Sequence, residues 1–348
     1  MATIARRQAT STRYAARPQQ RLNTYLLLKL ARTLAIRIVT YLILADIAFV
    51  FLFPVFYMLA TSIKSVQDLT DPTIQWIASG IDWQNYILAW QAINFWHSFS
   101  NSAQIAILSG VGQVISCAFV GYGFGRINFP GREILFLLVI FTFLVPPETI
   151  IVPLFILYKT MPRLAIDINL ASFPHIFAIN GTFGPGKILD HGWIDTYWPF
   201  IFPSFLGEGL KGSVFVLIFR QFFRGLPWEL EEAARVDGAG PLATFFRIML
   251  PLAKPAILVS FLFSVVWHWN DYLEPLIYLN RSELFTLPMR LSVLGQTLNE
   301  VTGGAGSEFY NEALAMAACV LVILPVLILY LFTQRFFTES IDRTGVVG

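Results

Sequence analysis

Charged residues are scarce in this chain of 348 residues. Asp, Glu, Lys and Arg make up 13% of it, against about 25% in a typical soluble domain. Hydrophobic residues make up 56%, and they lie in blocks near the ~20 residues that cross a bilayer. The scarcity of charge argues against a soluble domain, and the blocks predict an all-α polytopic membrane protein.

Cysteine and histidine are also scarce. The two cysteines, Cys117 and Cys319, lie inside apolar runs, which predicts packing residues and argues against a disulfide or a metal pair. The four histidines lack metal-ligand spacing, which argues against a metal site and against a membrane-embedded enzyme with paired His and acid motifs. No GxxxxGK[ST] phosphate loop occurs, so we do not expect the chain itself to bind ATP.

Acidic residues are absent from the first 37 positions, which hold eight lysine and arginine residues. A basic tail before an apolar span is typical of the cytoplasmic side of a membrane, so residues 1–34 are interpreted as a cytoplasmic tail. A nucleic-acid arm would look similar, but the neighbouring span disfavours it, and a transit peptide stays open. The apolar run that follows is too long for a cleaved signal peptide.

Six apolar runs between residues 35 and 337 predict six transmembrane helices. Their expected positions are about Ile36–Ser62, Asn101–Gly125, Ile134–Lys159, a run from between Thr196 and Ser204 to Arg220, Pro251–Leu279 and Ala313–Phe337. An even number of spans places both termini on one side. Arginine and lysine in the loop 126–133 and beside the run 227–255 predict that this side is the cytoplasm, with residues 338–348 as a C-terminal tail.

Small residues and prolines mark two of these spans. Gly121 and Gly125 form a GxxxG pair in the second span, which predicts close packing of helices, either within the chain or against a second membrane subunit. Pro146 and Pro147 predict a kink in the third span, because proline bends a helix. Neighbouring helices would then have to satisfy the carbonyl groups that the kink leaves free.

The most polar run in the second half of the chain is PWELEEAARVDGAGPLATFFRIMLPLAKP, residues 227–255. Pro227 is predicted to be the first residue of a helix, because the N–H that proline lacks has no partner there. Gly238 is predicted to end that helix, and Pro241 to start a second short one. The hairpin 227–250 would present acids and small residues to the cytoplasm, either as a docking platform or as a simple connector.

Polar residues inside membrane spans are costly and tend to face a cavity. Six of them are candidates for a substrate pathway: Trp269, Asn270, Asp271, Glu208, Lys211 and Glu148. The alternative for the first three is an interfacial aromatic belt with structural hydrogen bonds. Glu208 and Lys211 are three residues apart, so they would pair on one helix face or form a solvated helix start. His268 is predicted to be a packed residue and not a proton relay.

The run EAARVDGAGPLATFFRIMLP resembles the signature loop of the permeases of ABC importers. Its elements are Glu-Ala-Ala, three residues, Gly, nine residues, Ile, one residue and Leu-Pro. The positions concerned, with the acid before the glycine, are Glu232, Ala233, Ala234, Asp237, Gly238, Ile248, Leu250 and Pro251. The runs WNDYLEPLIYLNRSELFTLP and PVLILYLFTQRFFTESIDRTGVVG resemble the carbohydrate-uptake branch, similar to the smaller membrane subunit of the maltose transporter. The resemblance covers about residues 35–348 and is weakest in an apparent external insertion at about 161–193.

This resemblance implies a type I ABC importer permease fold in a bacterial or archaeal plasma membrane. The implied partners are a second permease chain, an ABC ATPase dimer that binds ATP and Mg, and an extracytoplasmic sugar-binding protein. The chain itself would hold no catalytic residue, cofactor, metal or nucleic acid. The hairpin would seat in a cleft of the ATPase, with Glu232 as a charged anchor, Gly238 at the bend, and Ala233 and Ala234 allowing close approach.

Two rival functions stay open. A permease of the same class for another solute, such as a glycerol phosphate or a peptide, fits the same motifs, because these report coupling to an ATPase more than the ligand. An ion-coupled secondary carrier would show internal repeats and mid-membrane carboxylates, and it would leave the hairpin unexplained. The insertion is predicted to contact the binding protein or the partner permease.

Overall fold

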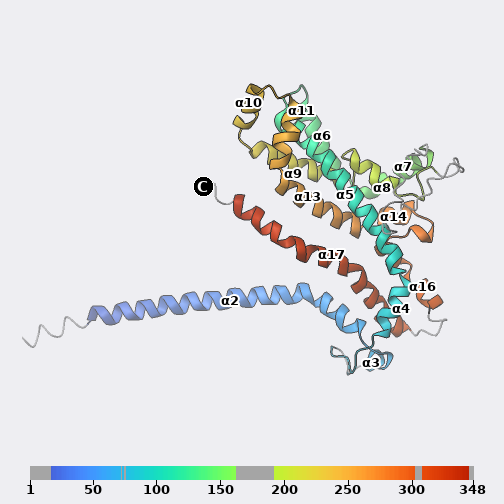
Figure 1. Ribbon diagram of the computed structural model, residues 1–348. Helices are drawn as coiled ribbons and strands as arrows, with labels where there is room; N and C mark the ends of the chain where they lie inside the picture. The colour runs from blue at the N-terminus through green and yellow to red at the C-terminus, as the bar shows by residue number, and fades with distance from the viewer. Residues whose placement is uncertain (1–16, 72, 74–75, 162–191, 302–307, 345–348) are drawn as a thin grey trace, which may run out of the picture. The chain divides into compact units, whose positions relative to one another are not determined.

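The computed structural model describes residues 17–71, 73, 76–161, 192–301 and 308–344 (Figure 1). Every regular element in this part of the chain is a helix, as the sequence predicts. The chain divides into two units, Met1–Ala60 and Thr61–Gly348. Most of the predicted insertion, the first 16 residues of the basic tail and the last four residues of the C-terminal tail lie outside the described residues.

The first unit is built from helix α2 (Arg17–Ser62), whose last two residues belong to the second unit. Apolar side chains between Leu30 and Leu59 are exposed all around the helix. A helix that is apolar on every side is typical of a membrane span, which agrees with the first predicted span.

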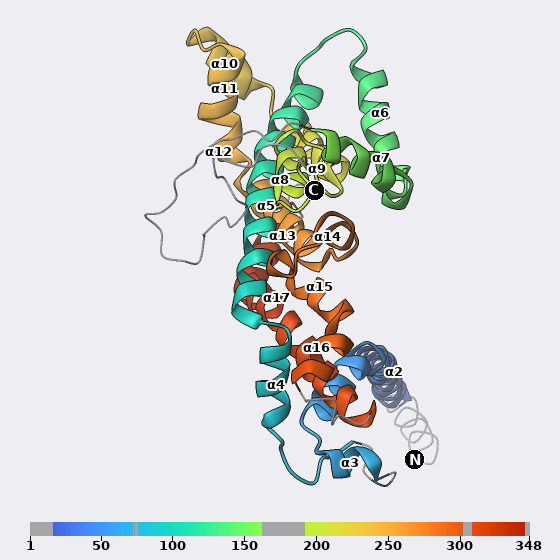
Figure 2. The ribbon, with the colours of Figure 1, turned by 90° about the vertical axis from the view of Figure 1, so that its right-hand side faces the viewer.

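The second unit is arranged around the long helix α5 (Phe95–Arg126), which packs against α8, α9 and α13 (Figure 2). The helix pair α10–α11 lies beyond one end of α5, and α4 lies at the other end (Figures 1 and 2). The other helices of this unit, in chain order, are α3 (Val66–Thr70), α4 (Gln84–Ala92), α6 (Arg132–Leu144), α7 (Pro147–Thr160), α8 (Trp198–Phe205), α9 (Gly212–Gly225), α10 (Glu229–Val236), α11 (Pro241–Thr244), the π-helical turn η2 (Phe245–Met249), α12 (Leu250–Leu252), α13 (Lys254–Asn270), α14 (Leu273–Tyr278), the 3-10 turn η3 (Ser282–Leu284), α15 (Leu287–Ser292), α16 (Leu294–Val301) and α17 (Glu308–Thr344).

The glycines of α5 allow its close contact with α9. A Cβ atom on Gly121 would lie 2.5 Å from the Cβ of Phe219, and one on Gly125 would lie 3.3 Å from the carbonyl oxygen of Arg220. The GxxxG pair therefore packs within the chain, which was the first of the two interpretations. Cys117 is a free thiol buried in the same region, so its predicted role as a packing residue is confirmed.

Three apolar clusters follow the length of this unit. One joins α4, α5, α13 and α17 and includes Trp269 and Leu314. A second joins α7, α8 and α14 around Tyr158 and Tyr278. The third joins α5, α9 and η2 around Phe219 and lies next to the hairpin.

The predicted spans agree with the structure in part. Among the described residues, three helices are long and apolar enough to cross a membrane, Lys29–Ser62, Phe95–Arg126 and Glu312–Gln334. They correspond to the first, second and sixth predicted spans. Two bent helix pairs also qualify if each is one span, and these correspond to the third and fifth. The predicted fourth span is divided into α8 and α9 by a loop.

The predicted kink of the third span is confirmed. Helices α6 and α7 meet at 99°, and the break falls at Val145 and Pro146, before Pro147 starts α7. Pro147 suits this position because the first residue of a helix needs no N–H partner.

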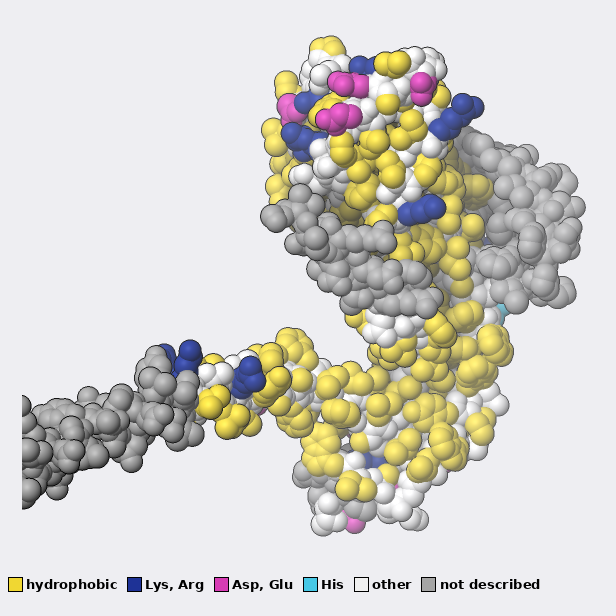
Figure 3. Space-filling view, turned by 60° about the vertical axis from the view of Figure 1, so that its left-hand side comes forward, with side chains coloured by type: hydrophobic (Ala, Val, Ile, Leu, Met, Phe, Trp, Pro, Cys, Tyr) yellow, Lys and Arg dark blue, Asp and Glu magenta, His cyan; other side chains and the backbone are white. Residues whose placement is uncertain are grey.

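Charged side chains gather at the hairpin end of the second unit, beyond a broad apolar surface (Figure 3). This distribution is what a bilayer requires, because its interior excludes charge and its surface does not.

Candidate functional site

The hairpin that the sequence singles out is formed by α10 and α11. Acidic residues occupy the first turn of α10, where the positive end of the helix favours carboxylates. Gly238 follows at φ +77°, in the left-handed region that favours glycine, and its N–H donates to the carbonyl of Arg235. Pro241 starts α11, so both the predicted helix end and the predicted restart are confirmed.

The prediction that Pro227 is the first residue of this helix is wrong. Helix α10 begins at Glu229, and the first carbonyl to accept an intrahelical bond is that of Trp228. The Pro227 carbonyl instead accepts a hydrogen bond from Arg126, at 3.3 Å. Pro227 therefore lies before the helix, in contact with the end of α5.

The second arm of the hairpin is less regular than one short helix. Phe245–Met249 forms the π-helical turn η2 between α11 and α12. Phe245 and Met249 are both buried in the cluster that also holds Phe223 and Tyr122. π-helical turns are rare and are often found at functional sites.

The hairpin carries exposed apolar side chains on both arms, together with exposed acids on the first. Val236 is 87% exposed, Leu242 60% and Phe246 58%, and Glu232 and Asp237 are exposed beside them. Exposed apolar side chains grouped in this way are typical of a protein contact. The arrangement favours a docking platform over a simple connector.

The other predicted coupling residues are distributed over both faces of the hairpin. Ala233 is exposed, whereas Ala234 is 3% exposed and packs inward. Ile248 is half-buried in the π-helical turn, Leu250 packs against the apolar cluster next to the hairpin, and Pro251 is exposed.

The hairpin is held to the end of α5 by Arg126. Its Nε lies 3.4 Å from Oε1 of Glu231, and the two side chains are 0% and 5% exposed. Its Nη2 donates to the carbonyls of Leu226 and Pro227, and its guanidinium lies 4.3 Å from the centre of the Trp228 ring. Burial raises the pKa of Glu231, and the positive charge of Arg126 opposes that shift.

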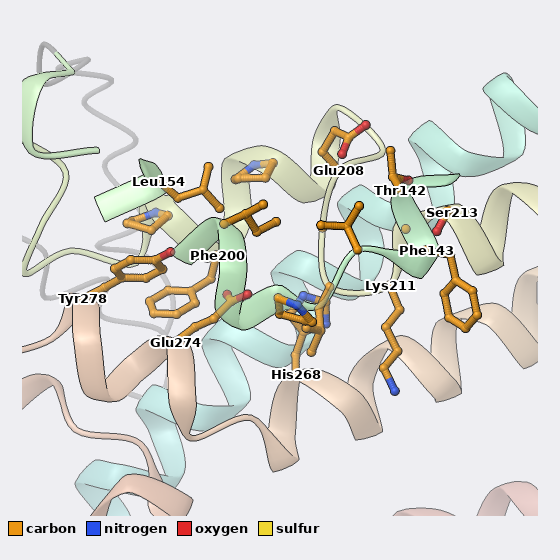
Figure 4. A pocket seen from close by; sticks show the side chains of 18 of the residues that line it. Thr142, Phe143, Leu154, Phe200, Glu208, Lys211, Ser213, His268, Glu274 and Tyr278 are labelled. Carbon is orange, nitrogen blue, oxygen red and sulfur yellow. The ribbon is translucent and has the colours of Figure 1, made fainter. Parts of the chain in front are cut away.

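A cavity of about 200 Å³ lies between α6, α7, α8, α9, α13 and α14. Figure 4 shows Glu274, Tyr278 and Phe200 towards one end of it and Glu208, Thr142 and Ser213 towards the other. Its wall is mainly aromatic and aliphatic, with a few hydroxyl and carboxylate groups. This composition is typical of a site for a small polar solute with apolar faces.

Lys211 lines the same cavity, but its ammonium group is directed elsewhere. Its Nζ lies 4.6 Å from the centre of the Trp267 ring, and Figure 4 shows the side chain pointing away from Glu208. Glu208 and Lys211 lie in the loop before α9 and both are exposed, so the pairing on one helix face is wrong and the alternative of a solvated helix start agrees with the structure. Lys211, at φ +56°, is the N-cap of α9, which begins at Gly212.

The remaining pathway candidates lie outside the cavity lining. Trp269 is buried, and its Nε1 donates to the carbonyl of Val322. Asp271 accepts the backbone N–H of Leu273, so it caps α14. Asn270 and Glu148 are exposed.

A buried polar network joins α5 to the loop beside the cavity. Gln113 donates to the carbonyl of Leu210 at 2.9 Å, and its side-chain oxygen accepts a hydrogen bond from Ser264. His268 is buried and its Nδ1 bonds the Ser264 carbonyl at 2.8 Å, so its predicted packed role is confirmed. Gln113 thus links α5 to the loop between α8 and α9.

Sequence reasoning missed Gln113 and the pairing of Arg126 with Glu231, and it did not select Glu274 as a pathway candidate. A signal for Glu231 existed, because it lies three residues before the buried Ala234, on the same face of α10. Among the described residues, no group of three His, Cys, Asp or Glu side chains could hold a metal ion.

Comparisons with known proteins agree with this geometry. A family model described as "Binding-protein-dependent transport system inner membrane component" matches residues 118–343. The arabinooligosaccharides transport system permease protein of Halalkalibacterium halodurans is 30% identical, over 87% of this chain and 94% of that protein. The melibiose/raffinose/stachyose import permease protein of Bacillus subtilis is 28% identical, over 92% of this chain and all of that protein.

The fold has a solved counterpart. A bacterial ABC transporter involved in the import of the acidic polysaccharide alginate includes a chain that matches with a TM-score of 0.67. The match covers 87% of this chain and 96% of that chain, at 22% identity. At this identity the likeness concerns the fold alone.

Proposed function

Because the chain belongs to the family of binding-protein-dependent transport system inner membrane components, we propose that it forms half of the translocation pathway of an ATP-driven oligosaccharide importer. The observation that carries this proposal is the ordered hairpin 227–250, with its exposed acids and apolar side chains. The chain is a transport subunit, and ATP hydrolysis is assigned to a separate ATPase.

The hairpin would seat in a cleft of that ATPase. Glu232, Ala233 and Asp237 are exposed on it, where they would meet the partner, and Gly238 supports the bend. Val236 and Phe246 would supply apolar contact area, because burying such side chains stabilises an interface.

The proposed assembly also contains a second permease chain, an ABC ATPase dimer with ATP and Mg, and an extracytoplasmic binding protein. We propose six spans with both termini in the cytoplasm of a bacterial or archaeal cell. Three long apolar helices and two bent pairs support this topology, as does the cluster of charges at the hairpin end of the second unit.

The cavity supports a neutral sugar as the solute. Aromatic and aliphatic walls suit the C–H faces of a sugar ring, and two carboxylates accept hydrogen bonds from its hydroxyl groups. The carboxylate of Glu208 would repel a phosphate group, while the ammonium of Lys211 lies over Trp267. This arrangement favours an oligosaccharide over the alternative of a glycerol phosphate. The names of the relatives from Halalkalibacterium halodurans and Bacillus subtilis agree with it.

The first experiment is purification of the tagged chain from its native membrane in mild detergent, followed by mass spectrometry of what accompanies it. We expect an ABC ATPase and a second permease. Glu232→Lys should abolish recovery of the ATPase and leave recovery of the second permease unchanged. Glu283→Lys, in the predicted external loop, is the control with the same change of charge. Recovery of the wild-type chain alone, under conditions that preserve complexes, would refute the assembly and favour an ion-coupled carrier.

The solute is tested by uptake of labelled arabinotriose and raffinose into cells that produce the recovered complex. Unlabelled glycerol 3-phosphate should not compete with the labelled sugar. Competition by the phosphate would contradict the solute class and leave the ATP-driven import in place.

A further inference from the structure

Helix α5 ends on a charged residue that is entirely covered. The Arg126 side chain is 0% exposed, and its partner Glu231, on α10, is 5% exposed. Leaving a buried charge without its partner is strongly unfavourable. The end of α5 and the start of α10 are therefore expected to move together.

Arg126 contacts the hairpin at four successive points along its base. It donates to the carbonyls of Leu226 and Pro227, stacks on the Trp228 ring and pairs with Glu231. The guanidinium group suits this role because it is planar, carries several donors and stacks on aromatic rings. A lysine would supply the positive charge but not the planar set of N–H donors.

A neighbouring ion pair shows a different arrangement. Arg220 on α9 lies 3.4 Å from Glu133 on α6, but the Glu133 side chain is 65% exposed. Water screens such a pair, so its contribution is small. The pair of Arg126 and Glu231 differs from this pair because both of its side chains are buried.

Helix α5 also reaches the cavity. Gln113 lies 13 residues before Arg126, about 20 Å along a helix, and it holds the carbonyl of Leu210 in the loop that lines the cavity. Packed helices transmit displacement because protein interiors are dense. A continuous series of contacts thus joins the hairpin, Arg126, Gln113 and the loop 206–211.

We propose that Arg126 and Glu231 are positioning residues that make helix α5 follow the hairpin, so that movement of the hairpin is transmitted to the loop at the cavity. This proposal rests on the proposed function, because it needs an ATPase that moves the hairpin. Neither residue lies on the exposed face assigned to the ATPase contact.

The test uses the complete complex and needs no knowledge of the solute. A cysteine replaces Leu206, which is 62% exposed and lies in the loop outside the cavity lining. Its rate of labelling by a maleimide is measured by mass spectrometry of the labelled peptide, with and without ATP and vanadate. We expect a change of about fivefold, the lower end of typical allosteric couplings. Glu231→Gln, which keeps the side-chain shape, should abolish that change while the complex still assembles and hydrolyses ATP.

Two further variants make the test specific. Arg132→Gln removes a nearby arginine whose hydrogen bonds go to its sequence neighbours Ile127, Asn128 and Glu133, and it should behave as the wild type. Arg126→Met combined with Glu231→Leu replaces the pair by apolar side chains, which often preserves stability. This double variant should assemble and still lack the nucleotide-dependent change.

The possible results separate the two proposals. A nucleotide-dependent change that persists in Glu231→Gln would overturn the positioning role. Loss of the assembled complex in Glu231→Gln, or no change at residue 206 in the complex with an intact pair, would also overturn it. Failure of the chain with an intact pair to recover any ATPase would refute the proposed function instead.

Discussion

Replacing Gly121 by alanine tests how closely α5 packs against α9. The added Cβ would lie 2.5 Å from the Cβ of Phe219 and 3.0 Å from the backbone nitrogen of Arg220. Carbon atoms in contact normally lie about 3.5–4.0 Å apart, so α5 and α9 would have to separate by roughly 1 Å. Such overpacking costs about 1–3 kcal/mol, because neither neighbouring atom belongs to the flexible end of a side chain.

The matched control is Gly123→Ala in the same helix. A Cβ at Gly123 has no heavy atom within 4 Å, and alanine is favoured over glycine in a helix by about 1 kcal/mol. Both variants gain that helical term, so the difference between them isolates the packing cost. We expect Gly121→Ala to be less stable than Gly123→Ala by about 1–3 kcal/mol.

The measurement is thermal unfolding of both purified variants in one detergent, followed by circular dichroism and by the monodisperse fraction on gel filtration. Gly123→Ala should unfold at or above the temperature of the natural chain, and Gly121→Ala below it. Equal unfolding temperatures for the two variants would refute the close contact between α5 and α9.

Three more predictions concern the hairpin, the external segment and the cavity loop. Gly238→Ala should weaken recovery of the ATPase, because φ +77° costs a non-glycine residue about 1–2 kcal/mol. Gly240→Ala is the control and should not weaken it, because Gly240 has φ −74° and equally open space around it. An equal effect of the two substitutions would contradict the argument. The Ser79 hydroxyl bonds Asp68 and holds the pKa of that carboxyl below its ordinary value of 3.8, so ionised Asp68 stabilises the segment above that value and loses this effect as the pH falls through the folded pKa. Ser79→Ala should therefore admit pepsin to residues 65–79 at a higher pH than the natural chain does, and identical cleavage profiles would count against it. Gln113→Leu should cost about 1–3 kcal/mol, measured by thermal unfolding, because the Leu210 carbonyl loses its side-chain partner and the buried Ser264 hydroxyl keeps only its longer contact with His268. Leu206→Cys should then label faster, and unchanged labelling would show that Gln113 does not hold the loop.

Hydrophobic blocks and turn residues allowed much of the fold to be predicted. The positions of α2, α5 and α17 follow from uninterrupted apolar runs. The bend at Pro146 and the turn at Gly238 follow from the backbone limits of proline and glycine. Such features depend on few residues that are close in the sequence.

The breaks in the fourth and fifth predicted spans depend on distant contacts instead. Gln113 takes the carbonyl of Leu210 in the loop between α8 and α9, and Asp271 accepts the backbone N–H of Leu273 at the start of α14, so side chains satisfy the backbone at both breaks. The mean hydropathy of a run of about twenty residues does not detect such a contact. For the same reason Pro227 was placed in the helix, although Arg126 holds its carbonyl.

The candidate site shows the same division. The local motif predicted the hairpin and its exposed Glu232, while the burial of Ala234 depends on how α10 lies against the bundle. Glu208 and Lys211 were found because charge is conspicuous in an apolar chain, and both line the cavity. Glu274 was not among the pathway candidates, because its distance from Glu208 along the sequence conceals that both line one cavity.

The π-helical turn Phe245–Met249 limits how the length of this chain can change during evolution. A turn of this kind holds one residue more than an α-helical turn, and each residue of a helix rotates the following ones by about 100°. Deletion of a single residue here would convert the turn to α-helical geometry and leave Leu250 and Pro251 close to their present sides relative to α10. Deletion of a residue from the regular turns of α10 would instead rotate the residues that follow by about 100°. Among descendants of this gene, we therefore expect a change of length between α10 and Pro251 to fall in this turn.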